Sequence, residues 1–287
     1  MLFNQYGFDD VDYDSHFQQF AQPFMVDGNM ENNRYFINEA QQNHILAINN
    51  ALLGLVGDAL ILLSVIDLTQ EAEHYFRFGV MRRLRMIDRS FKSLQNLIPP
   101  DRSIPLTQEQ SDDVCRNLNS IYIDLLGLLD NYAWTAIYQV GTAVTRSANP
   151  LSIGLFKKTF SDDATLKPIA DAVLVFADWE KDIKTRRNPA AHRMPLYVPS
   201  AAMTSDEIHE YEALEDQISN LLRMQEFEKH KALRKKQQRI GSFLPRFLHD
   251  PDGQVMNIYP TIPQDVGQTI KIGRIVQTFL RDQGSVA

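Results

Sequence analysis

Four long segments of this chain repeat apolar residues every three or four positions, and this helical period constrains the fold more than any other feature. Thr107 and Gln110 have capping-box spacing at the start of the third segment, and the second segment stops at Pro99 and Pro100. Long amphipathic helices joined by short connections favour a bundle. We expect helices over residues 33–69, 71–98, 108–140 and from 166 into a basic stretch at 184–195.

The segment before the first predicted helix has a different character. Residues 1–32 are aromatic and acidic and show no sustained period. We expect this segment to be a strap over the bundle or partly disordered. Its acidic residues also suggest that it occupies a basic cleft as an internal mimic of RNA.

The segment after residue 193 mixes strand and helix signals. It contains a short strand-like run, a long charged helix over 204–239, two strand-like runs around a Pro-Asp-Gly turn, and a closing helix over 264–281. The expected fold class is therefore mainly α. It consists of an antiparallel helical bundle over 33–193, with a small C-terminal β-ribbon and extra helices over 194–287 packed on the bundle.

Composition is that of a cytoplasmic globular protein. Apolar residues make up 44% of the 287 residues, enough to bury a substantial core. Cys115 has no partner for an internal disulfide, and the first residues lack a signal-peptide pattern. The most apolar run, over 51–66, contains Asp58 and is short for a bilayer. We expect a buried core helix there and no membrane association.

The charge distribution is uneven. The net charge is −7, which argues against a nonspecific nucleic-acid coat protein. Basic residues nevertheless gather in three runs, over 77–92, 181–193 and 229–239. Each run is either a local surface for an anionic ligand or a solvated helix face.

The stretch KTRRNPAAHRMP, over 184–195, ends the fourth predicted helix. Arg186 and Arg187 follow on its apolar stripe, where a cation needs a carboxylate or a ligand phosphate. Pro189 is expected to kink the helix, so that Arg187 and His192 converge although a straight helix would separate them by about 140°. Asn188 is placed to hydrogen-bond the imidazole. The stripe itself consists of Leu166, Ile169, Val173, Phe176, Trp179 and Ile183.

The run RNPAAH, with an arginine followed four residues later by a histidine at the end of a bundle helix, resembles the R-x(4 to 6)-H motif of the HEPN superfamily. The resemblance covers residues 33–193. It implies a dimerising helical bundle with two motifs lining one cleft, and in many members a metal-independent ribonuclease. Arg223 and His230 fit the same spacing but lie inside a charged helix and lack the asparagine.

The residue types predict how such a site would act on RNA. His192 is the candidate base that takes the 2′-hydroxyl proton, and Arg187 the cation that stabilises the phosphate. Arg186, Arg193 and Lys184 are expected to contact the RNA backbone. The products would carry a 2′,3′-cyclic phosphate and a 5′-hydroxyl, and the reaction needs no metal or cofactor.

Asp130 is the second candidate element of the site. It shares its predicted helix face with Ile123, Leu126, Trp134 and Ile137, so we expect a buried carboxylate paired with Arg187 or Arg186. A supporting role in the motif and a purely structural ion pair are both open.

Regulation and partners are left open by the sequence. In the toxin branch that is controlled by nucleotide transfer onto a tyrosine, the motif continues His-x-Tyr, whereas Met194 stands at that place here. A place in a defence or toxin–antitoxin system is an expectation, and a possible antitoxin or other partner stays unidentified. RNA and a second copy of the chain are the expected partners.

Two other functional classes share part of this sequence pattern. The alternative to a nuclease is a non-catalytic module of the same kind that binds RNA, nucleotide or protein. Glu71 and His74 have the spacing of a di-iron helix, but the second such pair and two further glutamates are missing.

Overall fold

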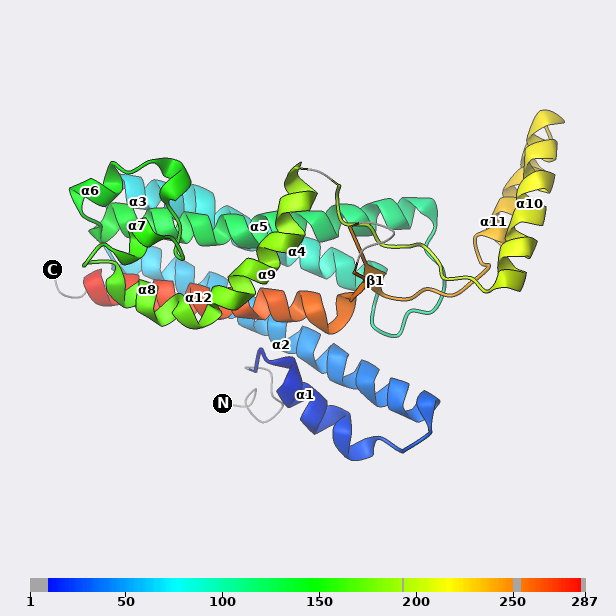
Figure 1. Cartoon of the computed structure of the whole chain (residues 1–287), viewed down its shortest axis with the longest axis horizontal. Helices are drawn as coiled ribbons and strands as arrows, with labels where there is room; N and C mark the ends of the chain where they lie inside the picture. Colours follow the sequence, from blue (N-terminus) through cyan, green and yellow to red (C-terminus); the bar gives the residue numbers. More distant parts are fainter. Residues whose placement is uncertain (1–9, 193, 250–253, 285–287) are drawn as a thin grey trace.

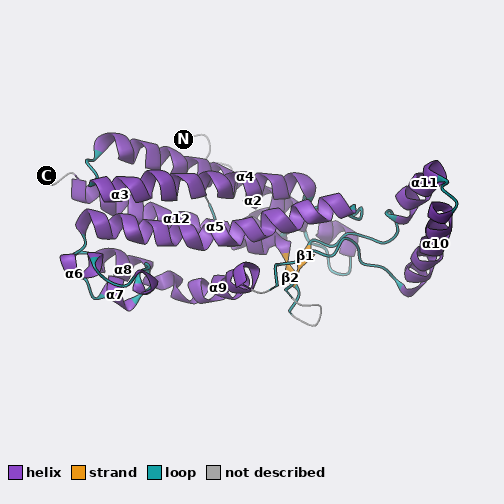
Figure 2. Cartoon of the chain, turned by 90° about the horizontal axis from the view of Figure 1, so that it is seen from above, coloured by secondary structure: helices purple, strands orange, loops and turns teal. Residues whose placement is uncertain are grey.

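Four long helical units run side by side and form the body of the molecule in the computed structural model (Figures 1 and 2). The structure describes residues 10–192, 194–249 and 254–284, and for residues 190–192 the backbone alone. The bundle helices are α2 (Met30–Val65), α4 (Met81–Leu97) with its N-terminal extension, α5 (Gln108–Val140) and α12 (Ile258–Gly284). The mainly α fold class is confirmed.

Helix α5 lies at the centre and contacts α4, α12 and α9. Its start is fixed by the capping box that the sequence predicts, in which Thr107 Oγ1 accepts from the Gln110 amide and Gln110 Oε1 accepts from the Thr107 amide. Along its length Tyr122, Leu125, Leu129, Tyr132 and Ala136 are buried. Burial of such a stripe is the main source of the bundle's stability.

The second predicted helix is interrupted by a π-helical turn. It consists of α3 (Gln70–Tyr75), a π-helix over Phe76–Val80, and α4. Phe76 and Val80 of the π-helix are buried, while Phe78 between them is 51% exposed. The π-helix carries one residue more per turn, so it changes which side chains of this helix face outward.

The fourth predicted helix is divided into shorter pieces. Short helices α6 (Ala143–Arg146) and α7 (Lys158–Ser161) precede α8 (Lys167–Val173), and a 3₁₀ turn over Leu174–Phe176 leads into α9 (Ala177–His192). Leu166, Ile169, Val173 and Ile183 of the predicted stripe are buried. Helix α9 lies across α5 (Figure 1) and continues through Pro189 to His192.

The charged segment 204–239 is a hairpin of two helices, so the single long helix predicted there is wrong. Helices α10 (Ser205–Arg223) and α11 (Phe227–Gln237) meet at Gln225, whose positive φ of 59° breaks the helix. The hairpin projects away from the bundle (Figures 1 and 2) and has a small core of its own around Leu214 and Ile218.

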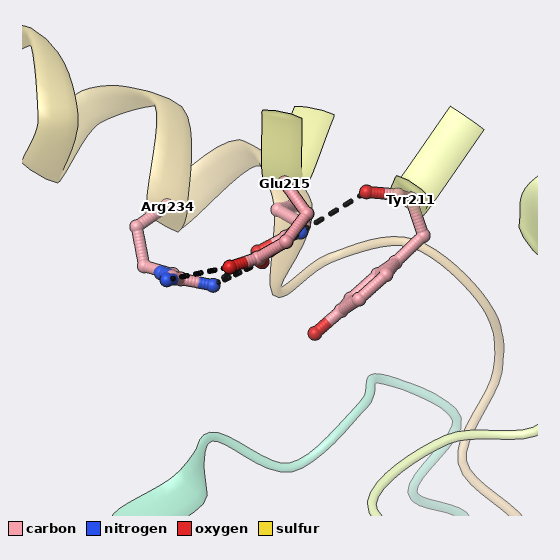
Figure 3. A network of polar contacts seen from close by, with 4 residues as sticks. Tyr211, Glu215 and Arg234 are labelled. Atoms are coloured by element: carbon pink, nitrogen blue, oxygen red, sulfur yellow. Dashed lines mark hydrogen bonds and ion pairs between the residues drawn. The ribbon is translucent and has the colours of Figure 1, made fainter. Parts of the chain in front are cut away.

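A polar network joins the two helices of the hairpin (Figure 3). Arg234 donates from both terminal nitrogens to Glu215, at 2.6 and 3.2 Å. The buried Gln237 donates to Glu215 Oε2 at 2.8 Å and to the Tyr211 carbonyl at 3.1 Å. A bidentate pair with a buried amide fixes the register of the two helices.

The predicted β-ribbon is present after α11. Strands β1 (Arg246–Phe247) and β2 (Met256–Asn257) pair antiparallel, and Leu248 forms a bridge with Tyr197. The Pro-Asp-Gly turn at 251–253 lies outside the described residues. Helix α12 then starts before its predicted residue 264 and packs against α2 and α5. The bundle therefore takes a long helix from the segment that was expected only to pack on it.

The N-terminal segment packs on α2 through α1 (Tyr13–Phe20). His16 and His44 are buried there with ring centroids 5.3 Å apart. Asp12 accepts from Lys271 Nζ of α12 at 2.6 and 2.8 Å. The acidic strap is thus docked against α2 and α12.

Helix α2 is only partly a core helix. By length and composition it passes as a candidate membrane span, with mean hydropathy 1.9 over an 18-residue window, of which 44% is buried. Core helices of soluble proteins share these values. The remaining face carries exposed apolar side chains, among them Leu46, Leu53, Leu60 and Ile61.

Candidate functional site

The end of α9 presents three polar side chains of the sequence motif to one pocket. Lys184, Arg187 and Asn188 line a pocket of about 270 Å³ between α9, α5 and the loop after α6. Arg187 also donates to the Asn188 side chain at 3.4 Å, and Lys184 forms an ion pair with Glu180. Its remaining wall is largely apolar and includes Leu126, Leu129, Trp134, Ile153 and Phe156.

Asp130 lines the same pocket, but it is not the buried carboxylate that the sequence predicts. Its side chain is exposed, and no ion pair with Arg186 forms. The pocket walls still displace water, which raises the pKa of Asp130, while the charge of Arg187 opposes that rise. Asp130 and Arg187 therefore line one pocket as electrostatic neighbours.

The buried acid on α5 is Asp124, six residues before Asp130. Asp124 is 2% exposed and accepts from Arg83 Nη1 of α4 at 2.8 Å and from Ser120. Arg83 also donates to Asn131 at 3.0 Å. This pair fixes α4 to α5, so it has the structural role that the sequence left open for Asp130.

Arg186 points into the bundle and not to the pocket. Its Nη1 lies 3.7 Å from Asp265 Oδ2 of α12, and its guanidinium lies 5.8 Å from the centroid of the Tyr122 ring. A separation of 3.7 Å is an ion pair without a hydrogen bond. The charge of Arg186 is therefore used within the core, and its predicted contact with RNA stays a prediction.

Asp265 connects α12 to α5 and α9. It accepts from Tyr122 Oη and from Trp179 Nε1, both at 2.9 Å, and is 3% exposed. Burial raises the pKa of Asp265, and Arg186 together with the two donors opposes the rise. Burial also raises the pKa of Tyr122, so the phenol keeps the proton that it donates. Removing one member of such a group would leave another polar atom buried without a partner.

Sequence reasoning missed Asp265, although a signal for it exists. Asp265 shares its helix face with Ile262, Thr269 and Ile272, which are all buried. A carboxylate on an apolar helix face needs a cation or several hydrogen-bond donors, and this holds for Asp265 as it does for Asp130.

The catalytic candidate His192 is the last residue of α9, and its side chain lies outside the described residues. Arg193 also lies outside them. A second histidine that the sequence did not single out, His249, lies shortly after strand β1. It lies near the backbone of Met194 and near Arg186, and burial is the main cause that lowers the pKa of His249.

The structure separates the two residues of the second arginine–histidine pattern. Arg223 ends α10 and His230 lies within α11, so the turn at Gln225 separates them. No group of three or more His, Cys, Asp or Glu is placed to hold a metal ion in the part of the chain that the structure describes. The described acidic strap does not line the pocket, because α1 packs on α2 and Asp12 pairs with Lys271.

Comparisons of the chain with protein-family models, with curated proteins and with solved structures gave no match.

Proposed function

We propose that this chain is a metal-independent endoribonuclease of the HEPN-like type. The observation that carries the proposal is the convergence of Lys184, Arg187 and Asn188 on one pocket at the end of α9, with His192 following in the same helix. An arginine fork suits the non-bridging oxygens of a phosphodiester. The apolar wall of the pocket removes water, which strengthens the attraction between that cation and developing negative charge.

In the proposed reaction the imidazole of His192 takes the proton of the 2′-hydroxyl group. The 2′ oxygen attacks phosphorus, the bond between phosphorus and the 5′ oxygen breaks, and that oxygen takes a proton from water. Arg187 stabilises the extra negative charge on the phosphate in the transition state, and Lys184 holds the neighbouring backbone. The products are a 2′,3′-cyclic phosphate and a 5′-hydroxyl.

Asp130 has a positioning role in this proposal. Its carboxylate lines the same pocket as Arg187 and Lys184, and its charge attracts both side chains when no RNA is bound. Asn188, which accepts from Arg187 at 3.4 Å, also restrains the guanidinium. Arg193 completes the backbone contacts in the proposal.

The proposal includes a homodimer in the cytoplasm. The exposed apolar side chains on α2, Leu53 at 52% and Leu60 at 53%, are a surface that a second copy can cover. Sedimentation equilibrium should give twice the chain mass for the wild type, and Leu53→Glu should shift the mass toward the monomer. A monomeric wild type at micromolar concentration would remove the dimer from the proposal.

Incubation of the protein with end-labelled single-stranded RNA in chelator tests the activity. We expect cleavage by the wild type and by His230→Ala, which removes the histidine of the decoy pattern, and a loss of at least 100-fold in His192→Ala. Equal RNA binding with no cleavage by any of the three would favour the non-catalytic binding module. Cleavage that His192→Ala retains would overturn the proposal.

A further inference from the structure

A second pocket, of about 560 Å³, opens where α3 and the π-helix meet the end of α5. Its wall includes Tyr75 from α3, Phe78 from the π-helix and Tyr138 from α5. This volume lies within the range of pockets that hold small organic groups. The proposed cleavage site does not use this pocket.

Three aromatic rings connect this pocket to the one at Arg187. The rings of Tyr75, Trp134 and Tyr138 lie 5.4–5.5 Å apart between centroids and within 17–21° of parallel. Trp134 also lines the pocket that contains Arg187. The same aromatic cluster therefore borders both pockets.

The spacing of residues along α5 sets the distance between the two pockets. Asp130, Trp134 and Tyr138 follow one another at four-residue intervals and so lie along one face of the helix. Eight residues of α-helix rise about 12 Å. Since stacked nucleotides in one strand are about 3.4 Å apart, this length corresponds to a few nucleotides.

The wall of the second pocket combines flat apolar groups with polar atoms at their edge. Phe78 is 51% exposed, and the guanidinium carbon of Arg82 lies 4.8 Å from its ring centroid. Arg77 is paired with Glu73 at 2.5 Å. Glu71 is a further carboxylate on the wall. A carboxylate accepts hydrogen bonds from the amino groups of bases, and it would repel a phosphate.

The backbone of the π-helix approaches α5 closely in this region. The π-helix over Phe76–Val80 packs against α5 at Gly79, where a β-carbon would lie 2.6 Å from Asn131 Cγ. Only glycine allows this approach without displacing Asn131, which is held by its bond with Arg83. π-helical turns are frequent at functional sites.

We infer that the second pocket binds an unstacked nucleobase of single-stranded RNA whose phosphate backbone lies at Arg187. The inference rests on the proposed function and specifies its substrate, because an accessible base is available in single strands and not in a duplex. Aromatic faces bind any base by stacking, and neighbouring arginines follow the backbone. The base would lie against Tyr138 and Phe78, with its polar edge toward Glu71.

RNA affinity measured in a His192→Ala background and in chelator tests this inference without any need for cleavage. Fluorescence anisotropy would compare a labelled single-stranded decamer with its duplex. Phe78→Ala removes an exposed ring, and Tyr138→Leu removes a ring while keeping apolar bulk. Tyr35→Ala, which removes an exposed ring at the N-terminal part of α2, is the matched control.

We expect each pocket variant to weaken binding of the single strand about tenfold, as the loss of one stacking contact does, and to leave duplex binding unchanged. Tyr35→Ala should have no effect, and circular dichroism should show the helix content of the parent in every variant. Unchanged affinity in both pocket variants, an equal loss for the duplex, or no binding of the single strand by the parent would overturn the inference. Loss of affinity with no wild-type cleavage would instead count against the nuclease alone.

Discussion

Arg186 and Arg187 are adjacent in α9, yet their guanidinium groups serve different parts of the molecule. Arg186 lies in the core, 3.7 Å from Asp265, whereas Arg187 lines the pocket beside Asp130. Neighbouring residues on a helix point about 100° apart, so one turn of α9 supplies both an anchor and a binding group. Substitutions at the two positions should therefore separate stability from activity.

Asp265→Ala should strongly destabilise the fold. It leaves the cation of Arg186 buried without its counter-charge and removes the acceptor of Tyr122 and Trp179, which costs about 3–5 kcal/mol. Asp265→Asn should cost less, because an amide oxygen still accepts. Urea denaturation monitored by circular dichroism measures both, with Asp216→Ala on exposed α10 as the control. A loss below about 1 kcal/mol in Asp265→Ala would contradict the role of this group.

Stability should fall as the pH is lowered from 6.5 toward 4. Burial lowers the pKa of His44 to about 4, so the folded protein keeps this imidazole neutral while the unfolded chain takes up a proton. The difference is about 3 kcal/mol over that window. His44 packs against His16, with Asp10 and Asp12 nearby.

The comparison of wild type with His44→Phe isolates this effect from other titrating groups. The variant loses the bond from His44 Nε2 to the Val11 carbonyl and should be less stable at pH 7. Its urea midpoint should then change less between pH 7 and pH 4.5 than that of the wild type. Equal changes in the two proteins would show that His44 does not carry the pH dependence.

Asp130→Asn should reduce cleavage about tenfold and leave RNA affinity unchanged or higher. The variant removes the negative charge that faces Arg187 and Lys184, so their positions are less restrained while the pocket becomes more positive. Single-turnover rates and anisotropy titrations give the two quantities separately. A weaker affinity for RNA in this variant would contradict the placement of Asp130 opposite the cations.

Glu215→Ala should loosen the α10–α11 hairpin without affecting the bundle. Both Arg234 and the buried Gln237 lose one of their acceptors, which costs about 1–3 kcal/mol locally. Amide hydrogen exchange over residues 205–237 should speed up. Because the hairpin has its own small core, exchange in α2 and α5 should keep its wild-type rates, and a parallel increase there would show that hairpin and bundle unfold together.

The sequence predicts the long helices well where local signals act alone. The capping box at Thr107 and the two prolines after Ile98 fix ends that depend only on neighbouring residues. The break in the helix over 204–239 was not predicted because Gln225 adopts a positive φ, and no glycine at this position indicates a turn. The π-helix over Phe76–Val80 was not predicted because buried residues recur every four positions through it, a spacing that an uninterrupted α-helix also shows.

For the site, the sequence located the basic residues but not their partners. Apolar neighbours on α5 suggested that Asp130 is buried, yet buried Asp124 and exposed Asp130 differ by six residues on one helix. Which of them meets an arginine depends on how α4 and α9 cross α5. The partner of Arg186 comes from Asp265, almost eighty residues along the chain, and no local pattern encodes such a pairing.

The most direct test of the central claim is the single-turnover rate of RNA cleavage in chelator for wild type, Arg187→Ala and Arg223→Ala, with the product ends analysed. The account predicts a 2′,3′-cyclic phosphate product, a loss of at least about 100-fold in Arg187→Ala with an unchanged melting temperature, and a wild-type rate in Arg223→Ala. Equal rates in all three proteins, or products with a 3′-hydroxyl, would contradict it.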